Sequence, residues 1–485
     1  MISKMKKLLY ALIIVGLLIS PVYASDLAAK ILLSMGQASG IRGMSGLTFY
    51  ADYSNSGINA DKAKGSPVAT VTATRSASNP ATTIDAVGNI TLVTNSNTIR
   101  FPKGKYTVGG FSAANGILIE PVRTNSLKDS YFANATITTN WRAISAATIS
   151  RSTTYTNPYL GGSVAKIVTS SDNDGLQTST SNLPSFGNGN TYTVSCLIRG
   201  SGTVNIFFQP TGGTKRESTA ITLNDDGWSY YWFYNTASVA ATGNVGIEAN
   251  GANSVTCYVA YMQCEYSGAG ASRRLPSSFI PTTTTALTRN AESLSYSSSG
   301  NRNDVETIVV KVNLPYVGAV AAYRKILDDN GDRRVIYDAT IDKWRMNTNF
   351  VDSTTCLATL TTALTANTNY IIAGVAQHSS PYAQIYLNGT SEATYTSGDY
   401  TTYNPGTAFY VGVRYDGIDQ FNGYIEKIAI FNRALSQAEI VQVGNLFNQV
   451  QVSQSAPPDT ETNGWLLENG DYWLLENGDY WLLEN

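Results

Sequence analysis

The chain is poor in the side chains from which most catalytic and metal sites are built. Its 485 residues include one histidine, His378, and four cysteines without a Cys-x-x-Cys pair. A zinc cage is therefore not expected. A Ser-His-Asp arrangement would have to be assembled around one imidazole, and a lone histidine is more often a surface or packing residue.

Charge is scarce as well. Charged residues make up 14% of the chain and the formal net charge is −2. Proteins that bind nucleic acid or anionic membranes usually carry a broad basic face, so neither is expected as a main partner. Hydrophobic residues, at 43%, suffice for packed cores, and the surface must be built from small polar residues and tyrosine. This composition is typical of an exposed β protein of two or three domains.

No apolar run near the N-terminus reaches the roughly 20 residues that a membrane-spanning helix needs. The run at 8–19 follows three lysines and precedes a Val-Tyr-Ala cleavage pattern. We therefore predict a signal peptide over residues 1–24, a mature chain that begins at Ser25, and no stable membrane span after cleavage. The alternative is an uncleaved docking helix, because 27–35 continues with a second apolar stretch.

The cysteines leave two possibilities open. Cys257 and Cys264 lie seven positions apart, which places them on opposite faces of one continuous strand and prevents a bridge between them. Cys196 could bridge to one of these two residues. Burial of all four cysteines, Cys356 included, as free thiols is the favoured alternative.

Alternation of apolar and polar residues dominates the rest of the chain. The segment 191–200, TYTVSCLIRG, predicts a half-buried antiparallel strand with Tyr192 and Cys196 on its apolar face. No βαβ rhythm appears, and turn residues separate the strands, so we predict an all-β fold of sandwiches or jelly rolls. The same alternation recurs in four further segments: 203–208, 307–314, 382–390 and 408–415.

One helix is expected. Ser436 and Glu439 form an S-x-x-E capping box, which predicts a helix start at this point. The apolar face that would pack the helix against a sheet consists of Ile440, Val443, Gly444 and Phe447.

Four segments occur in a fixed order, and their sequences are TATRSASNPATTIDAVGNI (72–90), GILIEPVRTNSL (116–127), SSFIPTTTTALTR (277–289) and FNGYIEKIAIFNRALSQAEI (421–440). In this order they resemble a family of phage and prophage structural proteins, tail- or virion-associated. In that family a carbohydrate-binding-module-like jelly roll precedes a laminin-G or concanavalin-A-like lectin domain. The match runs through Arg75 and through the run that ends at Arg289 and closes the first module.

The resemblance implies two tandem jelly-roll β-sandwiches with a short C-terminal β-repeat tail. It also implies an external, non-catalytic protein that recognises a cell-surface glycan or polysaccharide and is either virion-associated or secreted to the cell surface. The expected organisation after the signal peptide is an N-terminal segment (25–47), a carbohydrate-binding-module-like jelly roll (48–290), a laminin-G-like jelly roll (291–450), a linker (451–464) and a repeat tail (465–485).

The tail consists of WLLENGDY twice and then WLLEN. Each Asn-Gly pair suits a type I′ turn, which predicts a small meander in which Leu475 faces Tyr480. Both faces of this meander would be apolar, so we predict a homo-oligomer joined through the tail. The alternative is a terminal repeat of no fixed structure.

An enzymatic function is not expected. Glycosidases need two carboxylates at a controlled separation. The glucanases related to the second module carry them as E-x-D-x-x-E on one strand, and this run is absent here. Two other functions therefore come first: an adhesive glycan-binding protein, or a structural decoration protein that binds no sugar. A polysaccharide-active enzyme is the least favoured alternative.

Aromatic side chains are the candidate glycan ligands, because a sugar ring stacks on Trp and Tyr. In GWSYYWFYN (227–235) only one alternating set can face the core. We assign Trp228 to the core and Tyr231 to a glycan site, with Tyr258 and the loop residue Trp141 as further candidates. The alternative for each is ordinary packing.

No cofactor is firmly indicated. Asp416 and Asp419 are the candidate metal residues, because calcium prefers several oxygen ligands near such a loop. The acidic segment 328–332 better suits a hairpin turn. A structural turn is also the favoured interpretation for Asp416 and Asp419.

Overall fold

The computed structural model of the protein describes residues 41, 43–55, 69–74, 79, 81–251, 254–269, 275–317, 323–329, 333–338, 343–349, 355–397, 406–417, 419–449, 473–474 and 480–481. Gly40–Phe447 form one compact unit, and the two ends of the chain form a second. The predicted signal peptide, Arg75, the linker and both Asn-Gly pairs of the tail lie outside the described residues, as does the side chain of Cys356.

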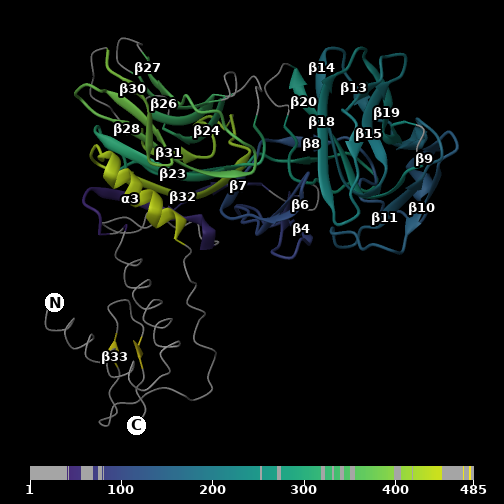
Figure 1. Cartoon of the computed structure of the whole chain (residues 1–485), viewed down its shortest axis with the longest axis horizontal. Helices are drawn as coiled ribbons and strands as arrows, with labels where there is room; N and C mark the ends of the chain where they lie inside the picture. Colours follow the sequence, from purple (N-terminus) through teal and green to yellow (C-terminus); the bar gives the residue numbers. More distant parts are fainter. Residues whose placement is uncertain are drawn as a thin grey trace, which may run out of the picture. The chain divides into compact units, whose positions relative to one another are not determined.

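The middle of the chain forms an N-terminal sandwich of two antiparallel sheets (Figure 1). The first runs in the order β10 (Thr148–Ser152), β11 (Val164–Val168), β20 (Thr256–Ala269), β14 (Asn190–Ser201) and β18 (Ser229–Thr236), with β8 (Arg123–Asn125) on β20 and β21 (Leu287–Arg289) on β8. The second runs in the order β16 (Arg216–Glu217), β15 (Thr203–Pro210), β19 (Ala241–Ala249), β12 (Gly175–Thr178) and β9 (Trp141–Ile144), with β13 (Ser185–Phe186) on β19 and β17 (Ile221–Thr222) on β15.

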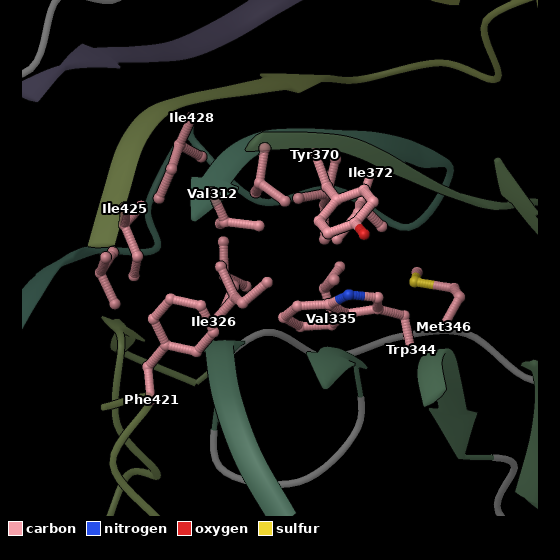
Figure 2. Close-up of a cluster of buried hydrophobic side chains, with 14 of the residues drawn as sticks. Val312, Ile326, Val335, Trp344, Met346, Tyr370, Ile372, Phe421, Ile425 and Ile428 are labelled. Carbon is pink, nitrogen blue, oxygen red and sulfur yellow. The ribbon is translucent and has the colours of Figure 1, made fainter. Parts of the chain in front are cut away.

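A C-terminal sandwich follows, also built from two antiparallel sheets. One runs in the order β1 (Leu47–Asp52), β32 (Gly423–Phe431), β23 (Glu306–Leu314), β28 (Thr368–Ala376), β29 (Ala383–Leu387) and β30 (Thr390–Tyr395), with β7 (Ile117–Ile119) on β32. The other runs in the order β2 (Thr70–Thr72), β22 (Ser293–Ser297), β31 (Ala408–Val411), β24 (Tyr323–Asp328), β25 (Arg333–Asp338), β26 (Lys343–Asn349) and β27 (Thr355–Thr359). Trp344 and Met346 of one sheet face Ile372 of the other in the core between them (Figure 2).

The predicted all-β class is confirmed, since the described strands form antiparallel ladders, with one isolated parallel bridge between Ile90 and Tyr159. The remaining elements in the described residues of the main unit are two hairpins, three short 3₁₀ turns and one helix. They are β3 (Ala81–Ile84), β4 (Ile90–Val93), β5 (Gly104–Thr107), β6 (Gly110–Ala113), η1 (Tyr53–Asn55), η2 (Ile137–Thr139), η3 (Thr180–Asn182) and α3 (Gln437–Asn448). None of the described helices has the length and hydrophobicity that crossing a membrane requires.

The boundary predicted at residue 290 does not separate the sheets. Strands β1, β2 and β7 precede the N-terminal sandwich in the chain, yet all three pair with strands of the C-terminal sandwich. Phe49 of β1 and Tyr53 beside it are fully buried in the C-terminal core. The sequence pattern shows that a segment is a strand but not which distant strand it joins, and this is why the division at 290 is wrong for the sheets.

Strand β14 is buried on both faces, so its prediction as a half-buried strand is wrong. Val194 and Cys196 enter the core between the sheets, as expected. Thr193, Ser195 and Leu197 on the opposite face are also fully buried. Leu197 packs in a second cluster on the outer side of the sheet, because another part of the chain covers that side.

A bulge in β20 overturns the expected placement of two cysteines. Ile198 pairs with Val259 and Leu197 with Tyr261, so the extra residue on β20 reverses the alternation of its side chains. Cys257 and Cys264 consequently lie in the same core instead of on opposite faces.

Cys196, Cys257 and Cys264 are buried free thiols, which confirms the favoured prediction for these three. Burial raises the pKa of Cys257 to about 12 and also raises the pKa values of Cys196 and Cys264. These thiols stay protonated at neutral pH.

The predicted helix is confirmed. The Glu439 carboxylate accepts a 2.8 Å hydrogen bond from the Ser436 backbone N–H, and the Ser436 hydroxyl oxygen accepts one of 3.4 Å from the Glu439 N–H. Ile440, Val443 and Phe447 pack with strands β23, β28 and β32 on the outer face of the sheet (Figure 1).

Replacement of the capping residue should destabilise the protein modestly. We expect Ser436→Ala to lower the free energy of unfolding by about 1 kcal/mol, because it removes the side-chain partner of a helix-terminal N–H. Gln442→Ala, at an exposed position of the same helix, should change it by less than about 0.5 kcal/mol. Urea denaturation measures both. Equal effects of the two changes would contradict a capping role.

In the second unit, β33 (Trp473–Leu474) pairs antiparallel with β34 (Tyr480–Trp481). A hairpin between the last two repeats is therefore confirmed, but its register differs from the prediction. Leu474, not Leu475, pairs with Tyr480. The pairing is displaced by one residue from the register that a two-residue Asn-Gly loop would impose. Oligomerisation through the tail stays a prediction.

Candidate functional site

A cleft of about 250 Å³ opens within the main unit, on the outer face of the sheet that contains β14, β18 and β20. Residues from both sandwiches and from the hairpins between β3 and β6 line it. Seven of these residues are aromatic: Tyr106, Tyr230, Trp232, Tyr261, Phe279, Tyr316 and Tyr424. The volume lies just below the roughly 300–1,000 Å³ of typical ligand pockets and suits one ring-sized group.

The floor of the cleft comes from the two strands on either side of β14, where Tyr230 and Tyr261 both pair with Leu197. Tyr230 comes from β18 and Tyr261 from β20, and their ring centroids lie 6.3 Å apart. Tyr261 also stacks on Phe279, with centroids 4.0 Å apart and ring planes 22° apart. The stack fixes the ring orientation on a sheet whose opposite face is held by the core.

Trp232 forms one side of the cleft. It is only partly buried, and its ring meets Tyr316 edge to face at 5.2 Å. Because Tyr316 follows β23, this contact joins the two sandwiches across the cleft. A half-buried indole beside an edge-on tyrosine offers a flat apolar surface, which is what a sugar ring requires.

Residues 227–235 alternate between two faces as predicted, but the face predicted to enter the core lies outside and the other face enters the core. Tyr231 and Phe233 pack against the core of the N-terminal sandwich. Trp228, Tyr230 and Trp232 pack in the outer cluster instead. The sequence could not distinguish the two sets because each is aromatic. The set that contains both tryptophans, Trp228 and Trp232, lies on the side of the sheet that faces the cleft.

Trp141 is fully buried and its indole N–H donates a 3.1 Å hydrogen bond to the Asp129 carbonyl, so the prediction of an exposed platform is wrong. Tyr258 is 9% exposed and lies on the same outer face as the cleft, with its ring 4.6 Å from that of Tyr155. Neither residue lines the cleft. Sugar binding by Tyr231 and Tyr258 stays a prediction.

Tyr230 places a buried hydroxyl beside the cleft. The side chain is 6% exposed, and its hydroxyl lies near those of Ser195 and Tyr316 without a hydrogen bond of regular geometry among the described residues. Burial raises its pKa well above the ordinary value, so the hydroxyl stays neutral. An unpaired buried hydroxyl costs about 1–3 kcal/mol, a cost that recurs at binding sites.

A buried ionic cluster supports the cleft. Arg100 binds both oxygens of Glu292 and, at 2.7 Å, Glu120, while Arg289 lies 2.9 Å from Glu120. All four side chains are at most 3% exposed. Ser278 donates to Glu120 at 2.6 Å. The cluster joins the loop before β5 to the residues that follow β7 and β21, at the junction of the two sandwiches.

Glu120 is the carboxylate that lines the cleft in the described part of the chain. Burial by itself would raise its pKa, but Arg289 and Arg100 outweigh burial and lower the pKa to about 2. The carboxylate therefore stays ionised at neutral pH and its oxygens are engaged by protein donors. A group in this state cannot donate a proton to a leaving group.

The candidate metal residues form a turn. Arg414 lies 2.5 Å from Asp416 and 3.2 Å from Asp419, so one guanidinium neutralises both carboxylates. Among the described residues no group of three or more His, Cys, Asp or Glu side chains is placed to hold a metal ion. His378 is half exposed and lies 2.5 Å from Asp304. It belongs to a surface pair and does not line the cleft.

The comparisons with known proteins concern mainly the C-terminal sandwich. The model of the concanavalin A-like lectin/glucanases superfamily matches residues 308–441. These residues form a concanavalin A-like, laminin-G-type domain. Most of β23, strands β24 to β32 and the start of α3 fall within the match, whereas β1, β2, β7 and β22 complete the two sheets from outside it. No curated protein matches the sequence.

Solved structures similar to the chain include receptor-binding domains of botulinum neurotoxins. One is that of mosaic serotype C/D with tetraethylene glycol bound, at 11% identity and a TM-score of 0.28, over 32% of this chain and 40% of the toxin chain. Another is the ligand-binding domain of serotype D in complex with N-acetylneuraminic acid, at 13% identity and a TM-score of 0.27, over the same shares. The match thus spans less than half of each toxin chain.

Proposed function

We propose that this protein is a non-catalytic glycan-binding protein and that the aromatic cleft is its binding site. The observation that carries the proposal is the half-buried Trp232 beside a floor of two tyrosines, one of which has a hydroxyl without a hydrogen bond of regular geometry among the described residues. A sugar presents an apolar ring face for stacking and hydroxyls for hydrogen bonds, and the cleft offers partners for both.

The carboxylates that line the cleft support sugar binding without hydrolysis. Hydrolysis of a glycosidic bond by the common mechanisms needs two carboxyl groups on either side of the bond, one of them able to act as an acid. In the described residues Glu120 alone lines the cleft, and two arginines keep it ionised. The concanavalin A-like superfamily includes both lectins and glucanases, and this site suits the first.

We further propose that the protein acts outside the cell, as a secreted surface protein or as a tail- or virion-associated component of a phage that recognises the host surface. The signal-peptide pattern at residues 1–24 and the order of the four segments that resemble phage structural proteins support this. A surface poor in charge is compatible with such exposure.

Replacement of Trp232 tests the proposed function. We expect Trp232→Ala to weaken binding of glycans that the wild-type protein retains on an array by about tenfold or more, because the indole supplies the open stacking face. The matched control is Tyr266→Ala, which removes an exposed ring of β20 that does not line the cleft, and its affinities should stay within about twofold. An array without any bound glycan would favour a structural decoration protein instead.

A further inference from the structure

Lys105 is a buried cation without an anionic partner. It lies on β5, is 7% exposed, and lines the cleft. Its ammonium donates a 2.6 Å hydrogen bond to the side-chain oxygen of Asn313 and lies 5.4 Å from the ring centroid of Tyr424. No carboxylate of the described residues lies within ion-pair distance of it.

Nearby buried cations differ from Lys105 in this respect. Lys311 lies 2.9 Å from Glu426, and Lys427 lies 3.4 Å from Asp52. Removal of an ammonium from water is costly unless a counter-charge accompanies it. Burial lowers the pKa of Lys105 to about 8, because removal from water disfavours the charged ammonium. A cation held at such a cost inside a binding cleft is a candidate for ligand recognition.

A second, smaller cavity of about 40 Å³ lies behind the cleft. Lys105 and Tyr424 line both cavities, so these two side chains form the wall between them. The other polar side chains around the small cavity are Asn115, Asn313, Asn369 and Glu426. A group that projects from a ring in the cleft toward this wall would meet an ammonium and amide donors.

We propose that the cleft selects a carboxylated sugar, whose ring stacks beside Trp232 and whose carboxylate pairs with Lys105. This inference rests on the proposed function of the same cleft. The carboxylate would supply the counter-charge that the protein itself does not provide, in a site where an ion pair is weakly screened. A sialic acid and a uronic acid share this chemistry, and the test below separates them.

The charges around Lys105 agree with an anionic ligand. Glu120 is held by Arg100 and Arg289, and Glu426 by Lys311, so both carboxylates are already neutralised. The tyrosines Tyr106 and Tyr424, which line the cleft with Lys105, stay neutral at physiological pH, because burial raises their pKa values.

The preference should also depend on pH. Lys105 loses its proton as the pH rises through about 8, so the preference for the carboxylated sugar should be full near pH 6.5 and decline toward pH 9. Sialic and uronic carboxylates are ionised across this whole range. A decline in this preference with rising pH would therefore result from deprotonation of the Lys105 ammonium.

Calorimetric titration with matched probes tests the proposal. The probes are sialyllactose against lactose, and trigalacturonate against its carboxyl-reduced form. We expect the full-length protein to bind the carboxylated member of one pair about tenfold or more tightly than the neutral member. Lys105→Met, which keeps the aliphatic stem, should bring the two affinities within about twofold without lowering the affinity for the neutral sugar.

Lys103→Met is the matched control, because Lys103 is two residues away, donates to the Ser54 carbonyl and does not line the cleft. It should retain the wild-type preference. Thermal unfolding at pH 7 checks folding, and Lys105→Met should not lower the Tm, since it removes an uncompensated buried charge.

The experiment distinguishes a failure of the role of Lys105 from a failure of the proposed binding function. A wild-type protein without preference in either pair, or a Lys105→Met variant that keeps the preference, contradicts the role of Lys105 while binding that depends on Trp232 still supports the cleft. An absence of binding to all four probes and to a wider glycan array would overturn both proposals.

Discussion

A fragment of residues 291–450, which covers the predicted laminin-G-like module, should not fold by itself. The fragment lacks β1 and β7, which cover one edge of β32. It also lacks Phe49, Tyr53, Ile117 and Ile119, all fully buried in its core. Each such side chain stabilises a fold by roughly 1.5–3 kcal/mol, so their sum approaches the 5–15 kcal/mol of a whole domain.

Circular dichroism and thermal denaturation of two fragments measure this effect. Residues 41–450 should show β structure and a cooperative transition, and residues 291–450 should show neither. Within the longer fragment, Phe49→Ala should lower the free energy of unfolding by about 3–5 kcal/mol. Val87→Ala, at a position 79% exposed, should have little effect. A cooperative transition in 291–450 would show that the early strands are dispensable.

Replacement of Arg100 should be nearly as damaging. Arg100→Met leaves Glu292 buried without its two charged hydrogen bonds and removes one of the two arginines that bind Glu120. Breaking a buried ion pair on one side costs about 3–5 kcal/mol, because the remaining charge is uncompensated. Chemical denaturation should show a loss of this size.

Arg199→Met is the matched control, because the side chain of its partner Asp225 is 48% exposed. An exposed pair contributes about 1 kcal/mol or less. Similar losses in the two variants would contradict the importance of the buried cluster. A double variant, Arg100→Met with Glu292→Gln, should recover part of the loss, since it removes the orphaned charge as well.

The same cluster predicts an acid dependence. The pKa of Glu120 in the folded protein is about 2, well below its ordinary value. Its contribution to stability is therefore complete above about pH 4.5 and is lost as the pH falls toward 2. Since Glu120 also lines the cleft, Arg100→Met should weaken glycan binding together with stability.

The sequence by itself determined the features that depend on neighbouring residues. Alternation identified the strands, because side chains of a strand point to opposite faces in turn. The Ser436 and Glu439 box placed the helix, because a cap acts within one turn. The repeat predicted a terminal hairpin, although its register is displaced by one residue.

Only the tertiary structure decided the features that depend on distant residues. It joined β1 and β7 to β32 across a whole sandwich, placed Tyr231 rather than Trp228 toward the core, and brought Lys105 next to Tyr424. An aromatic strand with two similar faces carries no local signal for which face is covered. That choice depends on the free energy gained when remote segments pack on one face, and one inserted residue, as in the bulge of β20, reverses the alternation beyond it.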